Sequence, residues 1–399
     1  MARVLLILPG EGYRTADFID AARALRCEVV VASDGRQLVD GGALRLDLDQ
    51  PAAAADAIVR AAAERPLDAV VAADDAGVVP AAIAARRLGL PHNPPDAACA
   101  TRDKLRLRQL LDGAHVPQPR FRAAGDPAAA AAAAGELGYP CVVKPRSLSA
   151  SRGVLRVDHA EQTRAAAAAA LAMDEPPVVV ERFCGGPEIA IEALLRDGHL
   201  EPLAVFDKPD PLEGPTFPET LYVTPSRHPL DVVAAAYEVT ARAAAAIGLR
   251  HGPVHAELRL TGDGPVLLEV AARTIGGLCG RTLRFGLGIS LEQLVLRAAL
   301  GRPLGDLRRV HRASGVMMLP VPRAGRLAAV RGLDAARAVA GIVGAEITIP
   351  AESDVLPLPE GGRYLGFLFA RGSEPGQVEQ VLRAAAGHVE IEIRDAFIG

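Results

Sequence analysis

The sequence predicts a multidomain protein that combines an α/β domain with α+β parts, and three observations lead to this fold class. The chain has 399 residues, half of them apolar, which is enough to form more than one hydrophobic core. In the first hundred residues short apolar runs alternate with alanine-rich stretches, a pattern typical of a parallel sheet covered by helices. The last hundred residues contain short strand candidates and a helix, which indicates a compact α+β module.

The first domain is expected over residues 1–100. Its strand candidates are the apolar runs at 4–8, 28–32 and 69–73. The first run is too short for a signal peptide and ends at Pro9-Gly10. No run approaches the ~20 apolar residues that a membrane helix needs. A Pro-rich turn at 90–95 marks the end of the domain.

Composition limits the classes of partner. The net charge is only -4 and the basic residues are scattered, so the chain lacks the concentrated positive charge that binds nucleic acid or anionic membranes. The five cysteines form no CxxC pair, which is typical of free thiols in a reducing compartment. We therefore expect a cytoplasmic protein that acts on small molecules and binds neither nucleic acid nor a membrane.

The remaining chain is expected to form a middle region at 101–305 and a C-terminal α+β module at 306–399. Within the middle region, a helix and three strand candidates predict a separate lid at about 118–185. The strand candidates of the lid are 141–144, 153–157 and 178–183. A long helix at about 231–247, a hairpin at 254–273 and a helix near 291–300 follow. The module has strand candidates at 314–319, 346–349, 364–370 and 389–393 and a helix at 375–386.

The hairpin carries two carboxylates that are expected to face each other. One face of its alternating pattern is apolar: Val254, Ala256, Leu258, Leu260, Val266, Leu268, Val270 and Ala272. The polar face holds His255, Glu257, Arg259, Glu269 and Arg273. A hairpin symmetric about Asp263 places Glu257 opposite Glu269, with Cβ atoms about 5 Å apart. A cation between them relieves the repulsion, and Mg²⁺ prefers carboxylate ligands.

The alternative for an isolated hairpin is a solvated face on which the acids pair with Arg259 and Arg273. A lysine upstream favours the metal site instead. Lys144 ends an apolar strand beside the small-residue turn 147–153, and such a turn offers backbone N–H groups to a phosphate. Ser149 and Ser151 add hydroxyl donors. The turn is not a GxxxxGK[ST] loop, so a simple hairpin connection is the alternative.

The strand at 178–183 predicts a second part of a nucleotide site. It ends at Glu181, Arg182 and Phe183, and a Gly-Gly-Pro turn leads to Glu188. We expect adenine to bond to the backbone of 181–183 and ribose hydroxyls to donate to Glu188. Acids that solubilise the end of a strand are the alternative.

Taken in this order, the motifs resemble the ATP-grasp superfamily over about residues 101–305. The resemblance adds Lys104, in Thr101-Arg102-Asp103-Lys104, as a lysine that contacts phosphate, and it identifies 147–153, closed by Gly153, as a mobile loop over the phosphates. It assigns Lys144, Ser149, Ser151, Glu181, Phe183 and Glu188 to the nucleotide, Glu257 and Glu269 to metal, and Arg273 to the transferring phosphoryl group. A two-lobed core between an N-terminal α/β domain and a C-terminal module is the implied architecture.

Within this superfamily, Glu269-Val270-Ala271-Ala272-Arg273 followed by Gly276-Gly277 resembles the L-amino-acid ligases, which make dipeptides. The loop at 207–226 also resembles the corresponding part of the L-amino-acid ligases. The resemblance implies that an amino acid or similar carboxylate is joined to an amine through an acyl phosphate, with release of ADP and phosphate. The resemblance also implies that the protein uses ATP and two Mg²⁺ ions, for which Mn²⁺ can substitute. It is compatible with a homodimer. Ala271 stands where many ATP-grasp enzymes have Asn, so a third protein ligand is missing.

Five residues receive substrate or proton-transfer roles. His255 is expected to orient substrate or carry a proton, with a structural histidine bonded to a carboxylate as the alternative. Lys208 and Glu219 lie in a Pro-rich segment, where Glu219 is a candidate receptor for an α-amino group. Arg281 and Arg284 are candidates for binding a substrate carboxylate. Solvated loop charges are the alternative for these last four.

Two other functions compete with the amino-acid ligase. One is another ATP-grasp reaction, such as a purine-pathway formate or bicarbonate ligase or a biotin carboxylase-like enzyme, because the nucleotide motifs are shared. The other is an NAD-dependent oxidoreductase or a nucleotide-sensing module built on the first domain. The turn Pro9-Gly10-Glu11-Gly12 follows the first strand, but no GxGxxG is present.

Overall fold

A computed structural model describes residues 1–10, 12–35, 43–358 and 360–395. Glu11, the third residue of the turn after the first strand, lies outside the described residues. The N-terminal domain is a four-stranded parallel sheet in the order β3-β2-β1-β4. Its strands are β1 (Arg3–Ile7), β2 (Glu28–Ser33), β3 (Leu44–Arg45) and β4 (Ala69–Ala72). Its helices are α1 (Thr15–Ala24), α2 (Pro51–Glu64) and α3 (Asp75–Leu88). The parallel α/β prediction is confirmed.

The lid is a small antiparallel sheet in the order β5-β8-β6-β7, covered by two alanine-rich helices. Helices α4 (Pro95–Ala100) and α5 (Lys104–Gly113) connect it to the N-terminal domain. The lid strands are β5 (Phe121–Ala124), β6 (Cys141–Lys144), β7 (Leu155–Val157) and β8 (Val178–Arg182). The helices are α6 (Pro127–Leu137) and α7 (Ala160–Met173). Buried alanines on both helices face the strands, since small side chains allow close packing.

An eight-stranded sheet in the order β13-β12-β9-β10-β11-β16-β20-β18 forms the centre of the molecule. It comprises β9 (Glu188–Arg196), β10 (His199–Lys208), β11 (Leu221–Thr224), β12 (Gly252–Thr261), β13 (Gly264–Ala271), β16 (Ala313–Leu319), β18 (Ile342–Ile347) and β20 (Gly366–Gly372). The last three strands belong to the C-terminal region, so the sheet continues across residue 306. Helix α8 (Leu230–Ile247) covers the apolar face of the hairpin β12–β13. The opposite, polar face of the hairpin contributes Glu257, Arg259 and Glu269 to a cavity that lid residues also line.

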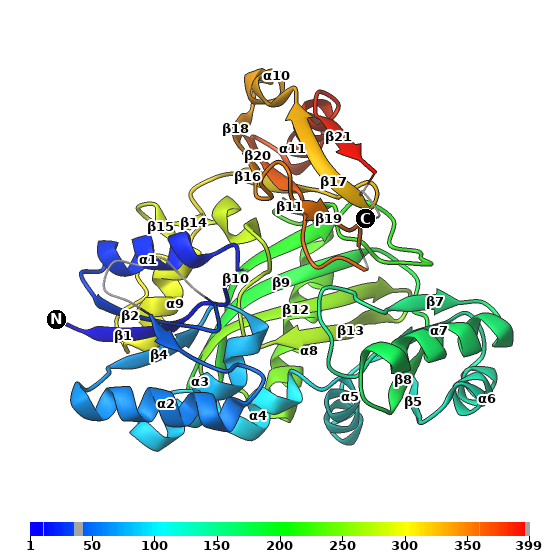
Figure 1. Ribbon diagram of the computed structural model, residues 1–399, viewed down its shortest axis with the longest axis horizontal. Helices are drawn as coiled ribbons and strands as arrows, with labels where there is room; N and C mark the ends of the chain where they lie inside the picture. The colour runs from blue at the N-terminus through cyan, green and yellow to red at the C-terminus, as the bar shows by residue number, and fades with distance from the viewer. Residues whose placement is uncertain (11, 36–42, 359, 396–399) are drawn as a thin grey trace.

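The remaining elements complete the two ends of the central sheet. A short 3-10 helix, η1 (Cys279–Thr282), and the strands β14 (Arg284–Phe285) and β15 (Ile289–Ser290) precede α9 (Leu291–Ala299), which packs against the N-terminal domain. The C-terminal region adds a sheet of β17 (Gly325–Arg331), β19 (Asp354–Val355) and β21 (Glu390–Arg394) with α10 (Leu333–Ala338) and α11 (Pro375–Ala386). Figure 1 shows this region above the central sheet, with the N-terminal domain and the lid on opposite sides. Among the described residues, no helix has the length and apolar character needed to cross a membrane.

The hairpin contains a β-bulge that corrects one sequence prediction. Thr261 pairs with Gly264 across a two-residue turn, and the register shifts by one residue between Glu257 and Leu258. As a result Leu267 is fully buried, while Leu268, which we expected in the core, lines a cavity. The prediction for Leu268 was wrong because strict alternation does not continue through a bulge. The shift is also what places Glu257 opposite Glu269.

The bulge can be tested by comparing two neighbouring leucines. Leu267→Ala removes a fully buried side chain, so we expect the free energy of unfolding to fall by about 2–5 kcal/mol. Leu268→Ala, with a side chain in a cavity wall, is the matched control and should cost clearly less. Urea denaturation of both variants measures the difference. Equal losses, or a larger loss for Leu268→Ala, would show that the bulge is misplaced.

Candidate active site

Two adjoining cavities lie beside the polar face of the hairpin. The first cavity, between the lid and the central sheet, has a volume of about 760 Å³ including its opening to solvent, and the second has a volume of about 1440 Å³ measured in the same way. The second is also lined by the N-terminal domain, through Asp74 and Asp75, and by the C-terminal region, through Met318 and Tyr364. Six residues line both cavities: Ser149, Ser151, Phe217, Glu219, Glu257 and Glu269. These six, called the shared wall below, mark the place where ligands in the two cavities meet.

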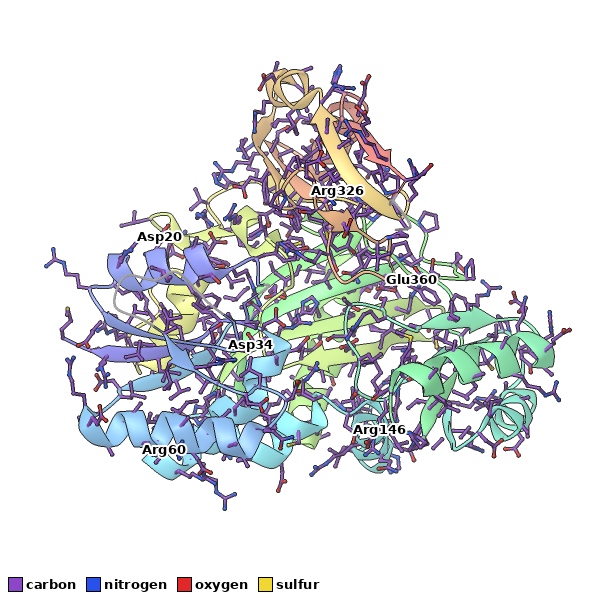
Figure 2. The ribbon with its side chains drawn as sticks, viewed as in Figure 1. Asp20, Asp34, Arg60, Arg146, Arg326 and Glu360 are labelled. Carbon is purple, nitrogen blue, oxygen red and sulfur yellow. The ribbon has the colours of Figure 1, made fainter. Side chains whose placement is uncertain are left out.

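Lys104 begins helix α5 and lines the first cavity. Asp103 caps the helix by accepting a hydrogen bond from the backbone N–H of Arg106. Asp103 also forms an ion pair with Arg146. Arg146 is labelled beside the lid in Figure 2. The Lys104 ammonium donates to the carbonyl of Leu148, and burial lowers the pKa of Lys104. Lys104 thus ties the 147–153 turn to α5 and brings a positive charge to the cavity.

Lys144 lines the same cavity at the end of β6 and is held by a buried anion. Its Nζ lies 2.8 Å from a carboxylate oxygen of Glu181, whose other oxygen accepts from Arg108 Nε at 2.7 Å. Burial alone would raise the pKa of Glu181, but Arg108 and Lys144 outweigh it and hold that pKa at about 2. Arg108 also donates to the carbonyl of Leu268 at 2.6 Å. Glu181 is therefore a bonded anion that connects the lid, α5 and the hairpin.

The backbone N–H groups of Arg182 and Phe183 are already hydrogen-bonded within the lid. The N–H groups of Arg182 and Phe183 donate to the carbonyls of Arg120 and Pro140, at 2.8 and 3.0 Å. These two donors are not free for a base, so any base contact at 181–183 has to use other backbone groups.

The ring of Phe183 and the carboxylate of Glu188 both line the first cavity. Two guanidinium groups lie against the ring, those of Arg156 and Arg259, with carbon-to-centroid distances of 4.7 and 5.7 Å. Glu188 accepts from Arg259 at 2.9 Å and from Lys208 at 2.6 Å. Glu188 therefore already has two cationic partners, and a ribose hydroxyl that donates to it has to share the carboxylate with them.

The turn at 147–153 brings two of its three predicted residues to the cavities. Ser149 and Ser151 belong to the shared wall. Gly153 does not line either cavity and has a structural role. Its φ is +68°, and a Cβ there would approach the ring of Pro145 to 2.7 Å. The glycine allows the turn to close against Pro145.

The hairpin places its two acids as predicted. Glu257 lies directly across from Glu269, and both are in the shared wall. Within the described residues the Glu269 carboxylate forms no hydrogen bond or ion pair, although it faces the positive charge of Lys104. Ala271 is buried and offers no ligand atom. Two opposed carboxylates, one of them without a protein partner, fit a divalent cation with oxygen ligands.

A buried lysine joins Glu257 to two other acids. The Lys208 ammonium lies 2.6 Å from Glu188, 2.5 Å from Glu219 and 2.9 Å from Glu257. The three carboxylates present oxygens within 4.8 Å of one another. Burial alone would lower the pKa of Lys208, but the three acids outweigh it and raise the pKa. Lys208 supplies a positive counter-charge to this acidic cluster. The sequence did not predict this role, because Lys208 was considered a substrate contact.

His255 lies between two carboxylates. Its Nδ1 is 2.5 Å from Glu192 and its Nε2 is 3.4 Å from Glu257. Burial alone would lower the pKa of His255, but Glu192 and then Glu257 raise it to about 9. Glu192 also accepts from the backbone N–H of Ile275 at 3.1 Å. His255 lines the second cavity and is positively charged near neutral pH.

Arg273 lines the second cavity and is held by the N-terminal domain. Its Nη2 lies 3.1 Å from Asp75, which is also 3.4 Å from Arg102. Burial alone would raise the pKa of Asp75, but Arg273 and Arg102 outweigh it and lower the pKa to about 2. The next residue, Thr274, accepts from the buried Arg14. The first domain thus fixes the orientation of Arg273.

The structure does not bring Arg281 or Arg284 to either cavity. Arg281 forms ion pairs with Asp17 at 2.9 Å and Glu346 at 2.5 Å. Arg284 donates to the backbone carbonyl of Leu283 at 2.7 Å. Arg281 therefore connects the N-terminal domain to the C-terminal region.

Three residues of this network were missed in the sequence, although each has a local signal. Arg108 follows Lys104 by four positions, which places both on one face of α5. Glu192 is an acid inside the apolar run of β9, and an acid in such a place needs a partner. Asp75 comes just after a parallel strand, at the edge of the sheet where ligands bind in open α/β folds.

Comparison with known proteins identifies three regions of the chain. A family model of the ATP-grasp domain matches residues 137–282, one of the ATP-grasp N-terminal domain matches 19–92, and one of the L-amino acid ligase C-terminal domain 2 matches 317–394. A crystal structure of L-amino acid ligase from Bacillus licheniformis superposes with a TM-score of 0.84 at 25% identity, covering 99% of each chain.

Two curated relatives match part of their own length. Alanine–anticapsin ligase of Bacillus subtilis is 28% identical over 263 residues, which is 60% of this chain and 55% of the relative. Carnosine synthase 1 of Gallus gallus is 32% identical over 304 residues, which is 69% of this chain and 32% of the relative. The chain thus spans about half of the first relative and a third of the second.

The anion between Lys144 and Arg108 predicts a pH-dependent contribution to stability. Because the folded pKa of Glu181 is about 2 and its ordinary value is 4.5, the contribution is complete above pH 4.5 and is lost as the pH falls toward 2. Glu181→Gln leaves the buried Arg108 and the partly buried Lys144 without their anion, so we expect a loss of about 3 kcal/mol at neutral pH. The difference from wild type should shrink below pH 4.5 in urea denaturation.

The control is Glu136→Gln, which removes an exposed lid carboxylate 3.5 Å from Arg122. It should leave the free energy of unfolding nearly unchanged at every pH. A difference between Glu181→Gln and wild type that does not vary with pH would contradict the ionised state of Glu181.

Proposed function

Because this chain belongs to the ATP-grasp superfamily and is similar to the L-amino-acid ligases, we propose that it is an ATP-dependent carboxylate–amine ligase. ATP-grasp enzymes use ATP and Mg²⁺. The observation that carries the proposal is the shared wall, where a lysine-lined cavity meets a larger cavity at the opposed carboxylates Glu257 and Glu269. Phosphoryl transfer needs a nucleotide and an acceptor to meet in this way beside positive charge.

In this proposal ATP occupies the first cavity. Lys104 and Lys144 face the phosphates, and the hydroxyls of Ser149 and Ser151 donate to the terminal phosphate at the shared wall. The base lies near Phe183, whose flanking arginines limit the width of the cavity. Fixed cations stabilise the charge on the transferring phosphoryl oxygens without reorganisation during the reaction.

Glu257 and Glu269 are the proposed metal ligands. Two Mg²⁺ ions, replaceable by Mn²⁺, would neutralise phosphate charge and orient the terminal phosphate. Glu257 and Glu269 would hold the ions without a third protein ligand at position 271, where the side chain is that of alanine.

The acyl donor and the amine occupy the second cavity. A carboxylate oxygen of the donor forms a bond to the γ-phosphorus as the bond to ADP breaks, and the product is an acyl phosphate. The amine nitrogen then bonds to the acyl carbon, phosphate leaves, and the amine loses a proton. Arg273, oriented by Asp75, stabilises the phosphoryl group and the departing phosphate.

Three further residues have defined places in this scheme. Glu219, in the shared wall, is the proposed receptor for the α-amino group of the acyl donor. Lys208 positions Glu219 and Glu257 through ion pairs and does not touch substrate. His255, bound between two carboxylates, orients Glu257 toward the cavity.

The reaction can be tested with a panel of substrates. Purified protein with ATP and Mg²⁺ should release ADP in the presence of one or more pairs of amino acids, and mass spectrometry should detect the corresponding dipeptide. Formate, bicarbonate and purine intermediates form the second arm of the panel. No ADP release with any pair of amino acids would contradict the proposal, and release in the second arm alone would favour the other ATP-grasp reactions.

The metal role predicts the behaviour of one hairpin variant. Glu269→Gln removes a charged ligand, so we expect ATP turnover to fall at least ~100-fold and Mn²⁺ binding, followed by electron paramagnetic resonance, to weaken. Asp263→Asn removes one charge from the exposed tip of the same hairpin and serves as the matched control. Unchanged Mn²⁺ binding and turnover in Glu269→Gln would exclude Glu269 as a ligand.

A further inference from the structure

The lining of the second cavity includes an arginine that has no ion-pair partner among the described residues. Arg152, in the turn that contributes Ser149 and Ser151, is half-buried and lines the second cavity. Its backbone N–H donates to the carbonyl of Ser149 at 3.3 Å. Among the described residues its guanidinium has neither a hydrogen bond nor an ion pair. By contrast, Arg273 in the same cavity is paired with Asp75.

The carboxylates of the second cavity are engaged elsewhere. Asp75 pairs with Arg273, and Glu219 and Glu257 pair with Lys208. Asp74 caps helix α3 by accepting from the N–H of the next residue at 2.6 Å. Glu269 faces Lys104 and is the proposed metal ligand. Arg152 is among the residues that line the cavity, and a guanidinium, with five donors in a planar fork, is suited to bind a planar anion such as a carboxylate from a ligand.

The backbone of the turn holds Arg152 in place. Ala150 and Ser151 have φ values of +57° and +55°, a left-handed conformation that costs energy for residues with a side chain. Gly153, directly after Arg152, is closed against Pro145. These backbone constraints on both sides of Arg152 fix where its Cα lies in the lining of the second cavity.

Arg152 lies on the substrate side of the shared wall. It lines the second cavity and is absent from the lining of the first, whereas its neighbours Ser149 and Ser151 line both. This placement favours a substrate anion over the phosphates of ATP. The carboxylate of the acyl donor reacts at the shared wall, beside Glu269, so an anion held elsewhere in the cavity belongs to the second substrate.

We propose that Arg152 binds the carboxylate of the amine-bearing substrate. This inference rests on the proposed ligase function and specifies its second substrate as an amino acid. The amine lies toward the acyl phosphate and the carboxylate toward the turn. The product therefore keeps a free carboxylate and is a peptide, not the amide of a simple amine.

The test compares amino acids with their α-carboxamides, which keep the amine and lose the negative charge. Wild type should couple an amino acid with a KM ~10- to 100-fold lower than that of its carboxamide, the range expected for one charged hydrogen-bonded contact. Arg152→Gln should raise the KM for the amino acid by that factor and leave the KM for the carboxamide and for ATP unchanged. Arg164→Gln, an exposed lid arginine on α7, is the matched control and should change none of them.

Two outcomes would overturn the inference while the ligase function stands. One is wild type that uses carboxamides as well as amino acids. The other is an Arg152→Gln variant that loses turnover equally with both acceptors or has a raised KM for ATP, which would place the guanidinium on phosphate. Thermal melting of both variants shows whether they are folded. The comparison of amino acids with carboxamides in the wild-type protein does not depend on any variant. Absence of coupling with every acceptor would instead reject the ligase function itself.

Discussion

The candidate active site depends on one buried ammonium group. Lys208 lies within 3 Å of three carboxylates that come from β9, β12 and the segment before β11. Three acids this close cannot be buried and ionised without a counter-charge. Lys208 supplies that charge from β10, and so holds Glu219 and Glu257 at the shared wall and Glu188 in the wall of the first cavity. Within the described residues, the Glu269 carboxylate has neither a hydrogen bond nor an ion pair.

Ion pairs between distant segments hold the rest of the site in the same way. Glu181 connects the lid to α5 through Arg108, and Asp75 connects the first domain to Arg273. Lys144 and Glu181 both lie in the lid, so their ion pair belongs to the lid, whereas the Glu181–Arg108 pair joins the lid to α5. The N-terminal domain lines the candidate active site and supplies the carboxylate that pairs with Arg273.

Much of this arrangement was predictable, and the failures have physical causes. Apolar runs identified the parallel strands and most of the lid, because burial imposes the period of the hydrophobic pattern. Pairing of Glu257 with Glu269 was predicted from a hairpin symmetric about Asp263, but the structure reaches it through a two-residue turn and a bulge. Arg281 carries charge in a suitable segment, yet it pairs with Asp17 and Glu346, which a local pattern does not reveal.

By itself the sequence determined the order of the elements, the two lysines, the hairpin acids and the resemblance to the ATP-grasp superfamily, because these depend on local spacing and residue chemistry. Only the tertiary structure decided which charges are neutralised. Lys208 became an internal counter-ion and Arg152 was left facing the second cavity, since ion pairing depends on distances between segments that are far apart in the chain. The same distances distinguish a side chain that stabilises the fold from one that is available to a ligand.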